Sequence, residues 1–179
     1  MTRGLLDVMR SECQLAGVLA HEVGHVAGRH STNQLSLIFR AKRFYEIVKK
    51  QVLRDRDMVG DVIEKLGGAL LLLGQLQYSR ANETEADLLG YYNMMRAGWH
   101  PKGMLQFFNY LTQKEGDPST IKTILSTHPK SSDRAETIRQ EMLIAEPPSN
   151  LVETTQSFTA IRASILRLPP PSMKSLPGE

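Results

Sequence analysis

The stretch "GVLAHEVGHVAGRHS", residues 17–31, places three histidines, one glutamate and three glycines in one short run. His21 and His25 are four residues apart, so on a helix they project about 40° from each other on one face. Two imidazoles placed in this way can both bind one zinc ion at about 2 Å. Glu22 follows the first histidine, where its carboxylate can reach a water at the metal and act as general base. Such histidine pairs also occur by chance in ordinary helices, so the motif alone only suggests a metal site.

The composition is that of a globular protein of one domain. The chain has 179 residues, of which 41% are hydrophobic and 23% charged, enough to bury a core. A net charge of +3 and only 6% aromatic residues do not favour nucleic acid as a partner. The single cysteine, Cys13, excludes an internal disulfide. The first ten residues lack the apolar core of a signal peptide, and the apolar run at 69–74 is too short to span a bilayer, so we expect a soluble chain.

The hydrophobic pattern predicts a mainly α protein. On the first long helix, four apolar residues recur at helical spacing and predict its buried face: Leu15, Leu19, Val23 and Val26. Helices are expected over the ranges 11–29, 33–56, 58–79, 80–97, 102–115 and 132–145. The fourth of these should end at Gly98, a natural C-cap. The "EPPSN" stretch at 146–150 predicts a boundary between a domain over 1–146 and a C-terminal tail over 147–179, which we expect to be partly disordered.

A third zinc ligand is predicted in "SRANETEADLLGYY", residues 79–92. Glu83 and Asp87 are again four residues apart on a predicted helix. Glu83 can bind the metal, and Asp87 can accept the free ring N–H of a zinc-bound histidine. Asn82 is placed to do the same for the other histidine. Glu85 is the competing ligand, although no acid follows it four residues later. The alternative is a charged helix start, with acids favoured by the helix dipole.

Four segments together carry a resemblance to a known family. They are "TRGLL", "LAGVLAHEVGHVAGRHS", "NETEADLLGYYNMMRAGWHPKGM" and "LSTHPKSSDRAETI", and they span about residues 2–145. In order and approximate spacing the chain resembles the gluzincin metallopeptidases that include CAAX prenyl proteases and HtpX-like heat-shock peptidases, in their soluble, periplasmic, BepA-like branch. The resemblance implies a zincin-like helical catalytic domain over 1–146, with the active-site helix packed on the glutamate-bearing helix. The resemblance also implies strands before "TRGLL", which we expect to be missing or minimal in this sequence.

The same resemblance implies the site and the activity. It makes His21, His25 and Glu83 the ligands of one Zn²⁺ per chain and Glu22 the general base. It further implies a zinc endopeptidase that acts on polypeptide substrates, namely misfolded or unassembled envelope proteins, in the periplasm or at the envelope. The alternative is a non-catalytic, zinc-stabilised binding module. Glu22 favours the enzyme, because a purely structural site has no use for a carboxylate beside its ligand.

The resemblance also places His128, in "STHPKSSD", over the zinc cleft. Its imidazole could donate a hydrogen bond to the oxyanion, or it could occupy the fourth zinc position and hold the enzyme latent. We expect it close to the metal in the resting structure. Arg134 could orient this loop or contribute charge to the transition state, although a helix-surface arginine is the more frequent case. His30 lies roughly 140° around the helix from His25 and is predicted to face away from the metal. His100, before a proline, is predicted to be a solvent-exposed loop residue.

A basic segment over residues 40–56 allows two interpretations. A basic amphipathic helix can make peripheral contact with anionic lipid. More often such a pattern is a solvated face over a core, especially where acidic residues are interspersed, as they are here.

Overall fold

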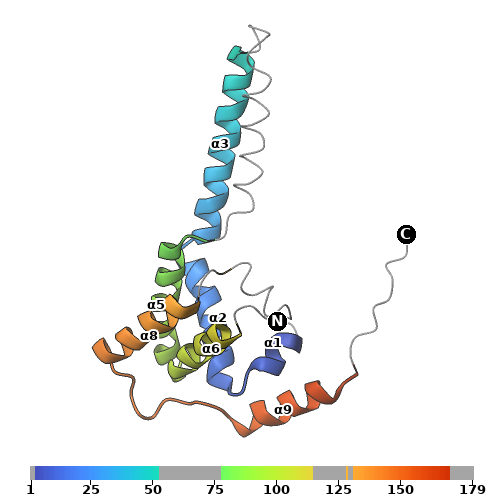
Figure 1. Cartoon of the computed structure of the whole chain (residues 1–179), viewed down its shortest axis with the longest axis vertical. Helices are drawn as coiled ribbons and strands as arrows, with labels where there is room; N and C mark the ends of the chain where they lie inside the picture. The colour runs from blue at the N-terminus through green and yellow to red at the C-terminus, as the bar shows by residue number, and fades with distance from the viewer. Residues whose placement is uncertain (1–2, 53–77, 115–127, 129–130, 170–179) are drawn as a thin grey trace.

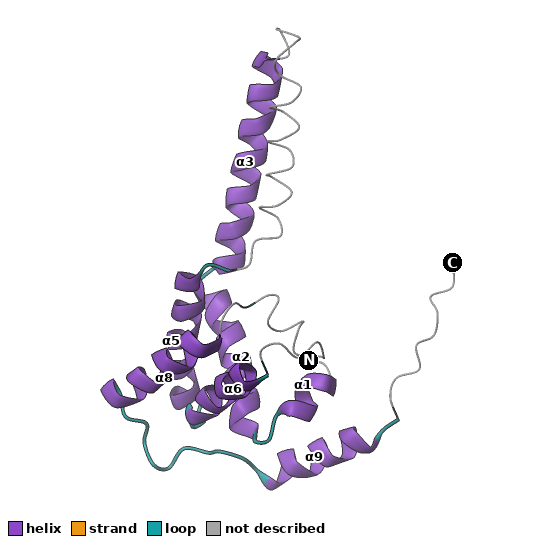
Figure 2. Ribbon diagram, in the orientation of Figure 1, coloured by secondary structure: helices purple, strands orange, loops and turns teal. Residues whose placement is uncertain are grey.

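The computed structural model describes residues 3–52, 78–114, 128 and 131–169 (Figures 1 and 2). Over these ranges the chain forms helices and no strand. The helices are α1 (Arg3–Val8), α2 (Glu12–Ala27), α3 (His30–Val52), α5 (Arg80–Arg96), α6 (Lys102–Gln113), α8 (Ser131–Ile144) and α9 (Gln156–Arg167). The mainly α fold is confirmed. The helix predicted over 58–79 lies almost entirely outside the described residues.

Four helices, α2, α5, α6 and α8, form the body of the described structure, and α3 continues away from it as one long helix (Figure 1). The core lies between these four helices and is built mainly from aliphatic, aromatic and sulfur-containing side chains. Its buried members are Met9, Cys13, Tyr91, Met94, Met104, Phe107, Phe108, Leu111, Ala135 and Ile138.

Helices α2 and α5 are in very close contact. A Cβ atom added to Gly24 of α2 would lie 2.4 Å from the carbonyl oxygen of Ala86 on α5. No larger residue fits at this position without moving one helix backbone. The close approach brings the histidine-bearing face of α2 directly against the face of α5 that carries Glu83 and Asp87.

The buried face of α2 is not the apolar face predicted from the sequence. Leu15 is partly buried against the core, but Leu19, Val23 and Val26 are 52%, 54% and 77% exposed, so the prediction is wrong for these three residues. The buried residues of this helix are instead small or polar: Cys13, Gln14, Gly17, His21, Gly24 and His25. Glycines on this face admit neighbouring helices closely, and partners on α5 and α8 satisfy the buried histidines. Packing and ion pairs therefore decide which face is buried, and hydrophobic spacing does not.

The ends of α5 follow local sequence signals and agree with the prediction to within a residue. The helix begins after Ser79, whose side-chain Oγ accepts a hydrogen bond from the backbone N–H of Asn82 at 3.1 Å. It ends before Gly98, which has a left-handed φ of +83°. These two caps fix the position of Glu83, in the first turn, relative to the rest of the body.

The segment that follows α8 returns along the body before forming α9. Trp99 and Val152 form an isolated parallel β-bridge. One residue further on, the carbonyl of Glu153 accepts a hydrogen bond from the backbone N–H of Cys13, near the start of α2, at 2.8 Å. Helix α9 then contacts α1. The domain boundary predicted at residue 146 stays a prediction, and the last residues of the predicted tail, 170–179, lie outside the described part.

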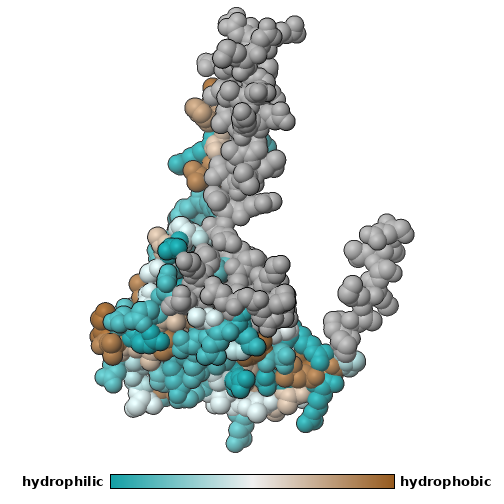
Figure 3. Space-filling model, in the orientation of Figure 1, coloured by the Kyte–Doolittle hydropathy of each residue, from teal (hydrophilic) through white to brown (hydrophobic). Residues whose placement is uncertain are grey.

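Hydrophilic side chains cover most of the described body in the view of Figure 3, with hydrophobic ones visible on α3 and at the end of α8. The exposed apolar residues of these two helices are Leu35, Leu37, Phe39, Phe44, Ile47, Leu143 and Ile144. No helix in the described ranges is both long and apolar enough to cross a membrane. The basic segment 40–56 falls on α3 as far as residue 52.

Candidate metal centre

Four side chains that are far apart in the sequence meet between α2, α5 and α8. His21 and His25 come from successive turns of α2, and Glu83 comes from the first turn of α5. His128 comes from the segment between α6 and α8. Each offers one nitrogen or oxygen atom, and these four atoms lie within 4.8 Å of one another. The first three side chains are almost fully buried.

Four of the six distances between these atoms are close to the ligand spacing of a zinc site, and all six are within 4.8 Å. The Nε2 atom of His21 lies 3.0 Å from Nε2 of His25 and 3.3 Å from Nδ1 of His128. The Oε1 atom of Glu83 lies 3.3 Å from Nε2 of His25 and 3.0 Å from Nδ1 of His128. Four nitrogen and oxygen ligands around a tetrahedral zinc ion are about 3.3 Å apart. The residues present therefore fit a zinc ion.

Asp87 and Arg134 contact the cluster from its outer side. Asp87, one turn after Glu83 on α5, is fully buried, and its Oδ1 lies 2.8 Å from Nδ1 of His21. Arg134 of α8 donates from Nε and Nη2 to the two oxygens of Asp87, both at 2.8 Å. Its Nη1 lies 3.0 Å from Oε2 of Glu83. One guanidinium thus holds two carboxylates. Arg134 is buried, so the helix-surface position that the sequence analysis considered the more frequent case is wrong.

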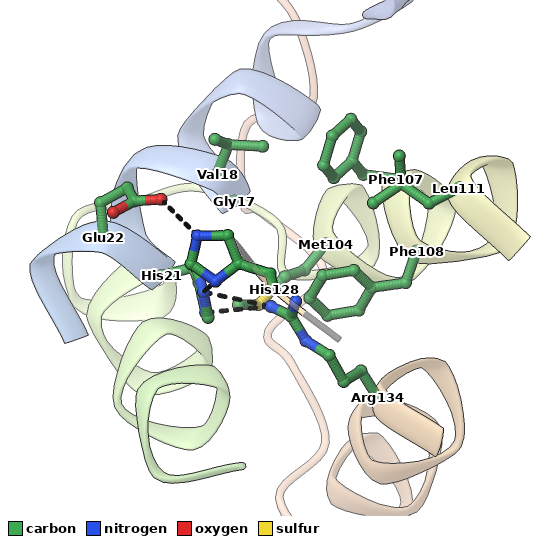
Figure 4. Close-up of a pocket in the computed structure, with 10 residues that line it drawn as sticks. All are labelled: Gly17, Val18, His21, Glu22, Met104, Phe107, Phe108, Leu111, His128 and Arg134. Atoms are coloured by element: carbon green, nitrogen blue, oxygen red, sulfur yellow. Dashed lines mark hydrogen bonds and ion pairs between the residues drawn. The ribbon is translucent and has the colours of Figure 1, made fainter. Parts of the chain in front are cut away.

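Glu22 and His128 face each other at the rim of the cluster. The side chain of Glu22 is 56% exposed, and its Oε1 lies 3.5 Å from Nε2 of His128. Figure 4 shows the imidazole of His128 between Glu22 on one side and Arg134 on the other. Because Nδ1 of the same ring faces Glu83, His128 contacts the predicted base and a predicted ligand at once. It lies against the metal cluster, the position expected from the sequence.

These contacts shift the pKa values of the ionisable side chains in and around the cluster. Burial raises the pKa of Glu83, but hydrogen bonding to His128 and His25 outweighs burial and holds this pKa well below its usual range. Hydrogen bonding to His128 also lowers the pKa of Glu22. Burial lowers the pKa of His128, but its contacts with the two glutamates raise it to about 9. Burial lowers the pKa of His21 and favours the neutral imidazole that a metal needs. Both glutamates are therefore carboxylates at neutral pH.

An apolar recess opens beside the cluster, between α2 and α6 (Figure 4). Its cavity volume is about 30 Å³, which is room for one or two water molecules. Besides His21, Glu22, His128 and Arg134, it is lined by Gly17, Val18, Met104, Phe107, Phe108 and Leu111. The guanidinium carbon of Arg134 lies 4.2 Å from the centre of the Phe108 ring, which also lines this recess.

Two predictions about the surroundings of His25 are wrong. His30, expected to face away from the metal, is 2% exposed, and its Nδ1 lies 2.8 Å from Nδ1 of His25. His30 therefore occupies the position that was predicted for the side chain of Asn82. The angular argument failed because α2 ends at Ala27, and the chain turns before His30. Glu85, the competing ligand, contacts His30 instead of the cluster.

Two further residues contribute in ways that sequence reasoning missed. The ring of Tyr78 stacks on the ring of His25, with centroids 4.1 Å apart and planes 27° apart. The sequence offers no local signal for this contact, because the stacking partner lies on another helix. His100 is half-buried rather than solvent-exposed, and its Nδ1 accepts a hydrogen bond from the backbone N–H of Lys102 at 3.1 Å.

A paired-histidine helix, a glutamate from a second helix and a half-exposed carboxylate beside the first histidine define the class of site found in metallopeptidases. The chain belongs to peptidase family M48, whose family model matches residues 1–142. Membership of this family implies a metal cofactor, and the cluster of His21, His25, Glu83 and His128 could bind a metal ion.

Named relatives agree with this assignment. The chain is 30% identical to the beta-barrel assembly-enhancing protease of Yersinia pestis over 155 residues, which are 85% of this chain and 32% of that protein. It is 30% identical to the mitochondrial metalloendopeptidase OMA1 of Schizosaccharomyces pombe over 137 residues, 76% of this chain and 39% of the relative. It is 28% identical to the metalloprotease YcaL of Escherichia coli over 145 residues, 78% of this chain and 52% of the relative. The chain thus spans about a third to about half of the length of these relatives.

Proposed function

We propose that the chain is the zinc-binding catalytic part of a metalloendopeptidase. The observation that carries this proposal is the half-exposed carboxylate of Glu22 beside a cluster of four side chains whose ligand atoms lie within 4.8 Å of one another. His21, His25 and Glu83 would hold one zinc ion, and Asp87 would fix the ring of His21. Family membership and the relatives named as proteases support the same function.

The residues of the chain divide the work of peptide hydrolysis. When bound, zinc would polarise the scissile carbonyl and the attacking water. Glu22 takes the proton from that water at a carboxylate oxygen and passes it to the nitrogen of the leaving amine. In the resting site hydrogen bonding to His128 lowers the pKa of Glu22 and keeps it a carboxylate, the form that a general base needs. Arg134 touches Asp87 and Glu83, so its expected role is to hold the ligands in place.

His128 holds the resting site closed in this proposal. Its Nδ1 completes a set of four ligand atoms, so it takes the position that a water needs. At the same time its Nε2 contacts the carboxylate of Glu22, the residue proposed as the base. Movement of His128 away from the cluster would free both groups, after which its ring could donate a hydrogen bond to the oxyanion.

The same four-ligand set supports a second candidate function. Structural zinc sites are closed by four protein ligands, whereas catalytic sites keep one position open. With His128 in place the cluster is closed, as a zinc-stabilised binding module without activity would require. Such a module gives no reason for the exposed carboxylate of Glu22 beside the cluster. The peptidase therefore explains more of the site.

The substrates we propose are misfolded or unassembled envelope proteins, cleaved in the periplasm or at the envelope. The support is the sequence resemblance together with the name of the Yersinia pestis relative, a protease that enhances β-barrel assembly. Peripheral contact with anionic lipid through residues 40–56 stays a prediction from the charge pattern.

The test compares zinc content with hydrolysis of casein. One zinc ion per chain is expected after dialysis, and this zinc should be lost in His21→Ala and Glu83→Ala but kept in Glu85→Ala. Glu22→Gln should keep the zinc and lose the activity, because an amide has the shape of the carboxylate but cannot take a proton. Equal hydrolysis by Glu22→Gln and the unmodified chain would remove Glu22 from the mechanism. Zinc binding without activity in any form would favour the binding module.

A further inference from the structure

The turn between α2 and α3 places a buried histidine, His30, next to the metal cluster. Helix α2 ends at Ala27, and Arg29 adopts a left-handed φ of 55°, which is uncommon for a residue with a side chain. The helix is interrupted there by two turn residues, and His30 begins α3 with its ring directed toward His25 near the end of α2. A Cβ atom on Gly28 would lie 2.5 Å from Nε2 of His30, so only glycine leaves room for this ring.

His30 bridges a predicted metal ligand and a carboxylate. Its Nδ1 lies 2.8 Å from Nδ1 of His25, and the two rings are 4.9 Å apart with planes at 78°. Its Nε2 lies 3.3 Å from Oε2 of Glu85. On another side, the ring of Tyr78 stacks against His25. The ring of His25 is therefore held on two sides, and His30 supplies its polar contact.

The positions of the protons follow from these distances. Two nitrogens 2.8 Å apart form a hydrogen bond only if one carries a proton and the other a lone pair. The Nε2 atom of His25 faces Glu83 and His21, so its lone pair is the one available to a metal. The proton of neutral His25 is then on Nδ1, and His30 must accept it at Nδ1. The remaining proton of His30 is on Nε2, where it points to Glu85.

We propose that His30 is a positioning residue of the metal centre, which accepts the hydrogen bond from His25 and is held in the required tautomer by Glu85. The inference rests on the zinc site of the proposed function. It gives each histidine ligand its own acceptor: Asp87 serves His21 with a carboxylate, and His30 serves His25 with a neutral ring nitrogen.

Such an acceptor fixes the tautomer and the orientation of a ligand histidine. Removal of acceptors of this kind typically weakens metal binding by about 10–100-fold. The expected effect of losing His30 is therefore on the affinity for zinc, and it can be measured without any peptidase activity.

The experiment uses a matched pair of variants of the full chain, His30→Asn and His30→Leu. The two replacements have nearly the same shape, and both lose the contact with Glu85. Only asparagine keeps an acceptor where Nδ1 of His30 now lies. Zinc affinity, measured by competition with a chelator, should fall about 10–100-fold in the leucine variant and much less in the asparagine variant. Circular dichroism of the metal-free proteins checks that both variants keep the helical content of the unmodified chain.

A second measurement does not depend on the variants. Nitrogen-15 NMR of the zinc-loaded, unmodified chain should show His25 protonated at Nδ1 and His30 protonated at Nε2. A proton on Nδ1 of His30 would overturn the inference, as would equal zinc affinities of the asparagine and leucine variants. Absence of stoichiometric zinc from the unmodified chain would overturn the metal site itself, and His30 would then have no ligand to position.

Discussion

Replacement of Arg134 by methionine should strongly destabilise the metal-free protein. Arg134 is only 7% exposed and donates two hydrogen bonds of 2.8 Å to Asp87, which is fully buried. It also lies 3.0 Å from Oε2 of Glu83, so one cation compensates two carboxylates. Methionine fills a similar volume but carries no charge, so both carboxylates lose their compensating cation. Removal of one partner from a buried ion pair typically costs about 3–5 kcal/mol, and we expect a loss of this size in the free energy of unfolding.

The assay is urea denaturation of the metal-free protein followed by circular dichroism, with the free energy extrapolated to water. Arg139→Met is the matched control, because Arg139 lies on the same helix and pairs with Glu136 through side chains that are about half exposed. This control should leave the free energy of unfolding nearly unchanged, since exposed ion pairs contribute little. Equal stability of the two variants would refute the idea that Arg134 compensates buried charge.

Two further predictions concern packing and access to the site. Gly24→Ala should destabilise the chain by about 1–3 kcal/mol, since the new Cβ would lie 2.4 Å from the carbonyl oxygen of Ala86 and this overlap outweighs the better helix propensity of alanine. Thermal unfolding measures the loss. Unchanged stability would contradict the close contact. His128→Ala should raise the rate of casein hydrolysis if His128 blocks the site, whereas a donor to the oxyanion would be revealed by a loss of about 100-fold or more; an unchanged rate would exclude both roles.

The candidate ligands could be found from the sequence because helical spacing is a local property. His21 and His25 share one face of a helix whatever that helix packs against, and Glu83 and Asp87 do so on another helix. The ends of α5 could also be predicted, because the capping residues lie within the segment itself. That the two helices meet does not follow from spacing, and at the sequence level it rested on the family resemblance.

The errors arose where the outcome depends on tertiary packing or on one backbone angle. Val23 belongs to a regular apolar stripe yet is 54% exposed, because the neighbouring helices pack on the glycine and histidine face of α2. The angle assigned to His30 assumed an unbroken helix, whereas α2 ends at Ala27 and Arg29 adopts a left-handed φ before α3 begins. Gly28 was the signal for a helix end at this point, since glycine commonly follows the last helical residue.

The hydrogen bond between Cys13 and Glu153 has a consequence for the order in which the protein is assembled during synthesis. The backbone donors of the first turn of α2 have no partner within the helix. Here the donor of Cys13 is satisfied by a carbonyl 140 residues later in the chain. A ribosome that has just completed the histidine motif has therefore not yet made the residue that anchors the start of the helix bearing it. Helix α2 reaches its final hydrogen bonding only after Glu153 has left the exit tunnel, so a nascent chain would complete α2 late, when nearly all of the body is already available to bury it.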